Sequence, residues 1–328
     1  MFANLLNKGL GSSLAVLISL FAVCFVSQLF SVITIDNNQF PDLFYNYFTN
    51  KIHHPLAVVS LNFCFILLGM FVIQLISNNQ EVVDKQNYFP QFFYLLLNAA
   101  ATGSGSISAQ LLTNVFILIS FHLLLATYRS DDSFRSIFNA AFFLGLSAFA
   151  SIAGIFTFPL FFVMLFILRP FYWREWVIAC IGLAVPLFIY ECLAYLSNFN
   201  QWYFFHSTAI FFRSLRIPHI SEFYMPLLLW LIFVFLLAML QSLSIGFGNT
   251  VKKQKSKLLL LWFLFFSIIT YFSSGANGAG IIMTLSIPLS FIVGDYFFNL
   301  KQKKISNTIL SIALLCALLI FLGKLGFI

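Results

Sequence analysis

Few side chains in this sequence can carry out acid–base or ionic chemistry, and a first group follows the first apolar run. Asp36 stands where that run ends, where a carboxylate can act as a general base on a bound acceptor or remain a solvated helix end. Lys51, His53 and His54 come later in the same stretch. Their cationic groups can bind phosphate or diphosphate oxygens, or they can lie beside lipid headgroups.

A second group lies near the middle of the chain. Glu191 falls inside an apolar run, where a carboxylate is costly. It is either an acid, base or cation partner facing a cavity, or a structural carboxylate paired with Arg213 or Arg216. The candidate catalytic residues are therefore Asp36 and Glu191. The candidate phosphate-binding residues are listed together: Arg213, Arg216, Lys51 and His54.

Metal binding is not predicted, and the sequence indicates no particular cofactor. His53 and His54 are adjacent, so they diverge by about 100° on a helix and face opposite sides of a strand. The five cysteines all fall inside apolar runs and include no Cys-x-x-Cys pair. We interpret them as small buried apolar residues.

These side chains are carried by a chain that is 61% hydrophobic and only 8% charged. In soluble domains, roughly a quarter of the residues are charged. With only 8% charged residues, this chain has too few polar side chains to cover a soluble core. The composition predicts a single integral membrane domain over residues 1–328. The net charge of +7 does not indicate nucleic-acid binding, because no basic face of useful size remains once the apolar spans are removed.

The apolar runs predict an all-α, polytopic transmembrane bundle. A helix that crosses the hydrocarbon needs about 20 apolar residues, with roughly 17 to 25 tolerated. Eight runs fit: 13–35, 56–77, 107–127, 176–196, 223–243, 258–274, 279–300 and 306–325. Three shorter runs cover 88–102, 137–153 and 155–168, with Gly154 at the tip of the last pair and Pro159 expected to bend its second arm. The count is eleven spans, or nine if 137–168 enters and leaves on one side.

The cations divide unequally between the two sides of this bundle. With the N-terminus in the cytoplasm, only Lys51, Arg213, Arg216 and Lys324 of the 17 Lys and Arg residues fall outside. Because basic residues accumulate in cytoplasmic loops, this predicts an inward N-terminus, an outward C-terminus and two outward loops, 36–55 and 197–222. The turn at 168–176 contains charged residues and tryptophans, and we expect it to lie at the cytoplasmic face of the membrane. We also expect the chain to be organised around residues 137–196.

Three segments carry a resemblance to a known family: residues 87–97, residues 138–146, and residues 168–176 continuing through Gly182 to Pro186. They resemble an uncharacterised multi-pass membrane-protein family of the Bacteroidota, a domain of unknown function. The resemblance spans about Tyr88 to Asp295. It implies a location in the bacterial inner (cytoplasmic) membrane but brings no activity with it.

The layout is also similar, more distantly, to the C-type glycosyltransferases, which take sugars from polyprenyl-phosphate carriers at the outer face. The shared features are an inward N-terminus, about eleven spans, an acidic residue after the first span, and a small-residue hairpin before a basic turn. The resemblance implies that Asp36 is the base, that Glu191 is a support or metal contact, and that Arg213 and Arg216 contact the carrier phosphate. The sequence lacks a tandem acidic motif and a periplasmic domain, and its first outward loop is short.

The expected function is therefore the handling of lipid-linked cell-envelope glycans at the periplasmic face. The expected partners are the lipid bilayer and a polyprenyl-phosphate-linked sugar. The alternative is a non-catalytic membrane subunit that docks a protein complex of the envelope. A transporter is a third hypothesis, although the two repeated halves that this class often shows are not visible.

Overall fold

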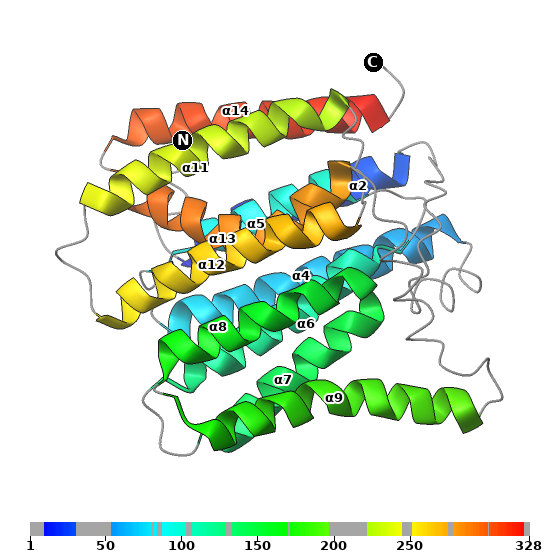
Figure 1. Cartoon of the computed structure of the whole chain (residues 1–328). Coiled ribbons are helices and arrows are strands. Elements are labelled where there is room, and N and C mark those ends of the chain that lie inside the picture. Colours follow the sequence, from blue (N-terminus) through cyan, green and yellow to red (C-terminus); the bar gives the residue numbers. More distant parts are fainter. Residues whose placement is uncertain are drawn as a thin grey trace.

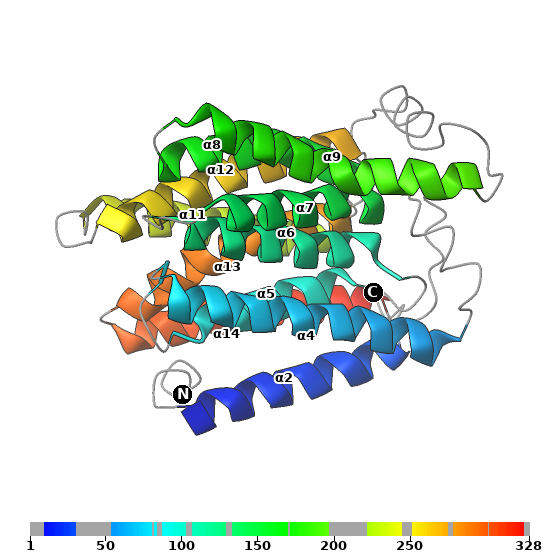
Figure 2. The same ribbon diagram turned by 90° about the horizontal axis from the view of Figure 1, so that it is seen from below.

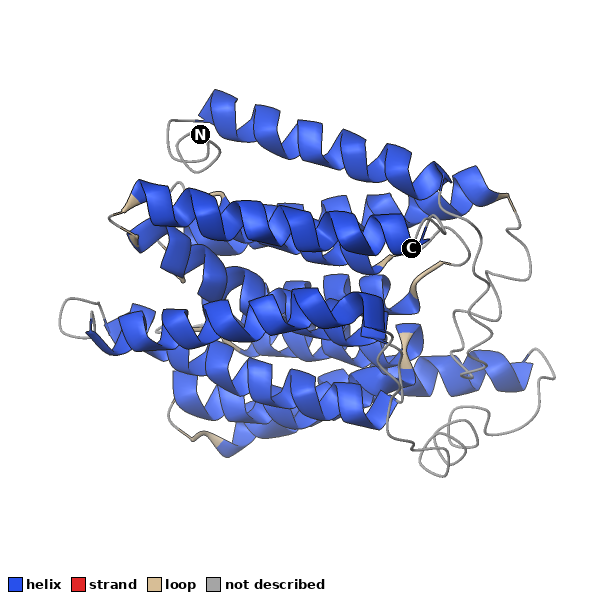
Figure 3. Ribbon diagram, turned by 90° about the horizontal axis from the view of Figure 1, so that it is seen from above, coloured by secondary structure: helices blue, strands red, loops and turns tan. Residues whose placement is uncertain are grey.

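The computed structural model describes residues 10–30, 54–80, 82–83, 87–102, 107–128, 133–169, 171–196, 222–244, 251–274, 278–300 and 302–324. Within these ranges the chain is helical and contains no strand (Figure 3), which confirms the predicted all-α class. The α-helices are α2 (Leu10–Phe30), α4 (Pro55–Asn79), α5 (Phe89–Ala101), α6 (Ala109–Ala126), α7 (Phe134–Ala150), α8 (Phe158–Leu168), α9 (Trp173–Leu196), α11 (Met225–Ser244), α12 (Val251–Ser274), α13 (Gly278–Asn299) and α14 (Lys303–Lys324). Two short 3-10 helices, η1 (Ile152–Thr157) and η2 (Glu222–Tyr224), precede α8 and α11.

The helices lie side by side with their axes roughly parallel or antiparallel, and they run across the views of Figures 1 and 2. Five described segments are long and apolar enough to cross a membrane: Leu56–Asn79, Ala109–Ala126, Trp173–Cys192, Ala279–Asn299 and Lys304–Gly323. Four apolar segments are shorter: Val16–Phe25, Phe134–Ala150, Gly154–Leu168 and Met225–Gln241. Large apolar side chains are exposed along the outer helices, such as Phe188 on α9, Leu229 on α11 and Leu315 on α14. These faces fit a lipid environment, since water would not tolerate apolar surface of this extent.

One end of the bundle holds every Lys and Arg of the described ranges except Lys324. We call it the basic end. It lies at the left of Figure 1, where α8 meets α9 and where α12 begins. Contacts between side chains join the helix termini there: the Lys255 ammonium lies 5.1 Å from the centre of the Tyr128 ring, and Lys257 pairs with Asp295.

The innermost helix is α5, in which every residue is buried. It packs against α13 most extensively and also against α4, α14 and α2. Asn87 lies two residues before the helix, where its side-chain oxygen accepts the Phe89 N–H at 3.0 Å and its amide donates to the Gly294 carbonyl at 3.1 Å. A Cβ on Gly294 would lie 2.8 Å from the Pro90 nitrogen, so glycine is what allows α13 to approach this closely. The centre of the bundle is thus α5, while residues 137–196 form one flank.

Close contacts between small residues join α7 to α9 on that flank. A Cβ on Gly145 would lie 2.8 Å from the Leu183 carbonyl oxygen, and one on Gly182 would lie 2.8 Å from the Phe138 carbonyl oxygen. Small residues let membrane helices approach this closely. Close packing then stabilises the contact, because the hydrophobic effect does not bring helices together within lipid. Two of the segments that carry the family resemblance, 138–146 and 182–186, therefore pack on each other.

Residues 137–168 form the predicted hairpin, and the short 3-10 helix η1 connects its two arms. Gly154 lies in η1, and its N–H donates to the Ser151 carbonyl at 2.8 Å. Pro159 does not bend the second arm, because it lies in the first turn of α8, where a proline N–H would have no helical partner. The hairpin runs along α6 to the end opposite the cations, where Thr113 Oγ1 lies 3.5 Å from the Ser147 carbonyl oxygen.

An ion pair joins four helix termini at the basic end. Arg169 Nε lies 3.2 Å from Glu175 Oε1, and the Ser133 hydroxyl donates to the same oxygen at 2.8 Å. Arg169 Nη1 also donates to the Thr127 carbonyl at 3.1 Å. The Glu175 side chain is only 4% exposed, so it depends on these partners for its charge. The neighbouring Trp173 is 65% exposed, as expected for an aromatic at the membrane interface.

Removing one partner of this pair should cost far more than removing both. We expect Glu175→Ala to lower the free energy of unfolding by about 3 kcal/mol, because it leaves the Arg169 charge in an enclosed site. The double variant Arg169→Met/Glu175→Leu should recover most of that loss. The measurement is denaturant or thermal unfolding of the purified protein in detergent, with Ser133→Ala as a control expected to cost about 1 kcal/mol. A double variant as unstable as Glu175→Ala would contradict the assignment.

Candidate functional site

Two of the candidate residues lie within the described ranges. His54 immediately precedes α4 and is exposed, and Glu191 lies in the last turns of α9 at intermediate exposure. The other four, Asp36, Lys51, Arg213 and Arg216, lie outside the described residues. The expected convergence of these groups on one outward cavity therefore stays a prediction.

The helices that lead toward the candidates have a defined arrangement. α2 precedes Asp36 and packs on α4 and α5, whereas α9 carries Glu191 and packs on α7. Figure 2 shows α2 and α9 at opposite edges of the bundle. The ends of α2 and α9 nevertheless lie at the same end of the bundle, opposite the basic end, as does the start of α4 beside His54 (Figure 1).

A buried network of neutral polar groups lies inside this half of the bundle. The Ser108 N–H at the start of α6 donates to Asn62 Oδ1 on α4 at 2.9 Å. The Ser108 hydroxyl lies 3.3 Å from the sulfur of Met283 on α13. Met283 is five residues past the start of α13, which places it about 8 Å below that helix end.

The carbonyl of the same methionine binds a second residue of α6, and the neighbouring Ser286 links α13 to α5. Its carbonyl accepts the side-chain amide of Asn114 on α6 at 2.9 Å and lies 2.7 Å from the Ser286 hydroxyl. Ser286 Oγ lies 3.4 Å from Asn98 Oδ1 on α5. We call these six residues the Met283 network: Asn62, Asn98, Ser108, Asn114, Met283 and Ser286.

A second amide contact lies beside this network. Gln28, two residues before the end of α2, donates to the Ala99 carbonyl at 2.8 Å and to the Thr102 hydroxyl. Gln28 is fully buried, as are Asn62 and Asn98. Gln28 joins α2 to α5, Asn62 joins α4 to the start of α6, and Asn98 joins α5 to α13.

The Met283 network is built from neutral groups. The Met283 network contains amides, hydroxyls and a thioether but no titratable side chain, so within the described residues it can hold helices in register and orient polar groups, not transfer protons. Within the same residues, no group of three or more His, Cys, Asp or Glu side chains is placed to hold a metal ion.

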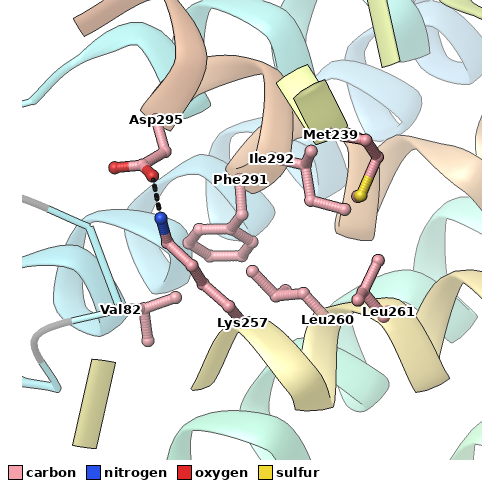
Figure 4. Close-up of a pocket in the computed structure, with 8 residues that line it drawn as sticks. All are labelled: Val82, Met239, Lys257, Leu260, Leu261, Phe291, Ile292 and Asp295. Atoms are coloured by element: carbon pink, nitrogen blue, oxygen red, sulfur yellow. Dashed lines mark ion pairs between the residues drawn. The ribbon is translucent and has the colours of Figure 1, made fainter. Parts of the chain in front are cut away.

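The basic end contains the other polar cluster. Lys257 Nζ lies 3.1 Å from Asp295 Oδ2, and Lys253 Nζ lies 3.8 Å from Oδ1 of the same carboxylate. Asn299 donates to that Oδ1 at 3.2 Å. Lys257 and Asp295 line a pocket of about 50 Å³ between α11, α12 and α13, whose other walls are apolar (Figure 4).

These two clusters were not among the predictions from the sequence. Asn62, Asn98 and Asn114 each stand inside an apolar run, where an amide needs a partner from another helix, and that signal could have identified them. Asp295 is likewise an acid within an apolar run, close to a lysine-rich end. Which helices meet could not be inferred from either pattern.

No known protein family matches this chain, and neither a curated protein nor a solved structure matches it. The two resemblances described above therefore rest only on the sequence segments given there.

The Met283 network should contribute measurably to stability. We expect Asn114→Leu, which keeps the side-chain volume, to lower the free energy of unfolding by about 1 kcal/mol, because hydrogen bonds between membrane helices contribute roughly 0.6 to 1.7 kcal/mol. Asn79→Leu, at the exposed end of α4, is the matched control and should leave stability unchanged. The measurement is unfolding in detergent. Equal effects of the two variants would show that the network is dispensable.

Proposed function

We propose that this chain is a polytopic protein of a bacterial inner membrane that handles polyprenyl-phosphate-linked sugars at the periplasmic face. In this proposal Asp36 is the base that deprotonates the acceptor, and Arg213 and Arg216 contact the carrier phosphate. Lys51 and His54 supply further cationic contacts. Glu191 has a supporting role at the same membrane face. It is not the base, because α9, which carries it, packs on a different side of the bundle from α2, which leads to Asp36.

The observation that carries the proposal is the separation of the charges between the two ends of the bundle. Every described Lys and Arg except Lys324 lies at the basic end, so the helix ends that flank residues 31–53 and 197–221 belong to the opposite end. By the positive-inside rule the basic end faces the cytoplasm. The candidate base and phosphate ligands then face the periplasm, where lipid-linked sugars are used.

The proposal includes eleven spans with the N-terminus inside. The hairpin of α7, η1 and α8 runs beside α6, which is itself long enough to cross. Seventeen residues of α7 extend about 25 Å, and η1 with α8 about 28 Å, close to the roughly 30 Å of a hydrocarbon core. These lengths favour two crossings over a re-entrant loop.

Cysteine labelling tests the orientation. In a variant without the native cysteines, Lys255→Cys should resist a membrane-impermeant maleimide in intact cells and react after the inner membrane is permeabilised. Lys324→Cys, at the end of α14, should react once the reagent reaches the periplasm. Labelling of Lys255→Cys from the periplasm would invert the topology and remove the proposed roles with it.

Substitution of the candidate base tests the activity. Asp36→Asn should abolish the envelope glycan that depends on this protein while leaving the protein at its normal level in the membrane, because an amide cannot accept the acceptor proton. Asp42→Asn removes a charge from the same segment and should have no effect. The measurement compares glycan profiles of a deletion strain complemented with each variant.

The alternative function makes a different prediction in the same strains. If the chain is a non-catalytic subunit that docks an envelope complex, both Asp36→Asn and Glu191→Gln should support a normal glycan profile, and a stable protein partner should co-purify with the full chain. That combination would replace the glycan-handling proposal.

A further inference from the structure

A small cavity lies between α6, α12 and the hairpin of α7, η1 and α8. Its volume is about 10 Å³. Each residue that lines it is at most 6% exposed, so the cavity lies in the interior of the bundle and not on a face that lipid covers. One water molecule requires a cavity of about 10 to 15 Å³. The cavity therefore has the size of a single water molecule.

Two hydroxyl groups stand on the otherwise apolar wall of this cavity. Ser120 belongs to α6, and Thr157 is the last residue of η1. The other lining residues are leucines, phenylalanines, an isoleucine and a methionine. Ser120 lies six residues before the end of α6, about 9 Å along the helix, which is too far for a serine hydroxyl to reach the interface.

The Ser120 hydroxyl differs from the other buried hydroxyls of the bundle. Ser147 donates to the Leu144 carbonyl at 2.6 Å and Ser290 to the Ile287 carbonyl at 2.8 Å, each within its own helix. Ser120 is only 3% exposed, and its hydroxyl has no hydrogen-bond partner among the described residues. A hydroxyl buried without a partner is costly, so an acceptor inside the cavity would stabilise the fold.

Thr157 provides the complementary group. Its hydroxyl donates to the Gly154 carbonyl at 2.6 Å, and the lone pairs of its oxygen remain able to accept a hydrogen bond. A water molecule that accepts the Ser120 proton and donates to Thr157 Oγ1 uses both groups. Met164 is the remaining lining residue whose side chain can accept a hydrogen bond, through its sulfur, and it can take the second proton of the water.

We propose that this cavity binds one water molecule, which bridges Ser120 on α6 to Thr157 where η1 passes into α8. The bridge is a polar link between α6 and the second arm of the hairpin on a wall that is otherwise apolar. Thr113 of α6 contacts the first arm at Ser147, so the two links together hold both arms against α6. The site does not depend on the proposed glycan function.

A structure of the full chain in detergent, at a resolution that shows ordered water, tests the proposal directly. We expect a density peak at a hydrogen-bonding distance of about 2.5 to 3.0 Å from both Ser120 Oγ and Thr157 Oγ1. A map that shows ordered water elsewhere in the protein but no peak in this cavity would overturn the proposal.

Thermal unfolding in detergent tests the contribution of the bridge. Ser120→Ala should lower the unfolding temperature by about 2 °C, because it removes one hydrogen bond of the water. In a cavity without water the same substitution would remove an unpaired hydroxyl, and the unfolding temperature would rise or stay unchanged.

A double-mutant cycle separates the bridge from a local effect at Ser120. Thr157→Val has a similar side-chain volume but removes the acceptor, so Ser120→Ala should have little further effect in that background. Ser290→Ala is the matched control, because its hydroxyl donates within α13, and its effect should be equal in both backgrounds. An equal loss from Ser120→Ala in the two backgrounds would mean that no water joins the two residues.

Discussion

Polar groups inside these apolar helices need hydrogen-bond partners within the bundle, and the rest of the structure depends on that constraint. Lipid does not drive apolar helices together as water does, so association requires close packing and hydrogen bonds between helices. α5 shows both. It is buried on every side, Asn87 and Asn98 tie it to α13, and Gly294 lets the two backbones approach.

The same constraint separates the polar groups by depth. Charges are far more costly than amides in hydrocarbon. The ion pairs Arg169–Glu175 and Lys253 and Lys257 with Asp295 accordingly lie at the basic end. Among the described residues, the Met283 network inside the other half is made of neutral groups, as at Asn62 and Asn114. Among the described residues, ionic chemistry is therefore confined to the interface, and the bundle interior provides orientation.

The helices themselves could be predicted because hydropathy records which residues face lipid or core, and the observed boundaries differ mainly at polar ends. α12 begins at Val251, several residues before its apolar run, because its lysines continue the helix while their ammonium groups reach the interface. The partners of buried amides could not be predicted. Ser286 and Asn98 are 188 residues apart, and a single sequence gives no information on which helix faces pack together. Of the candidate site, only His54 and Glu191 fall within the described residues.

α13 is the element that joins the two halves. It contributes Met283 and Ser286 to the neutral network and, about 18 Å further along, Asp295 to the lysine cluster. Its spanning segment is also the most buried of the five, at 72%. Because protein interiors are close-packed, the contacts of α13 with α5 and α6 in one half and with Lys257 in the other hold the two clusters at fixed positions along this helix. α13 thus carries residues of both polar clusters on one helix.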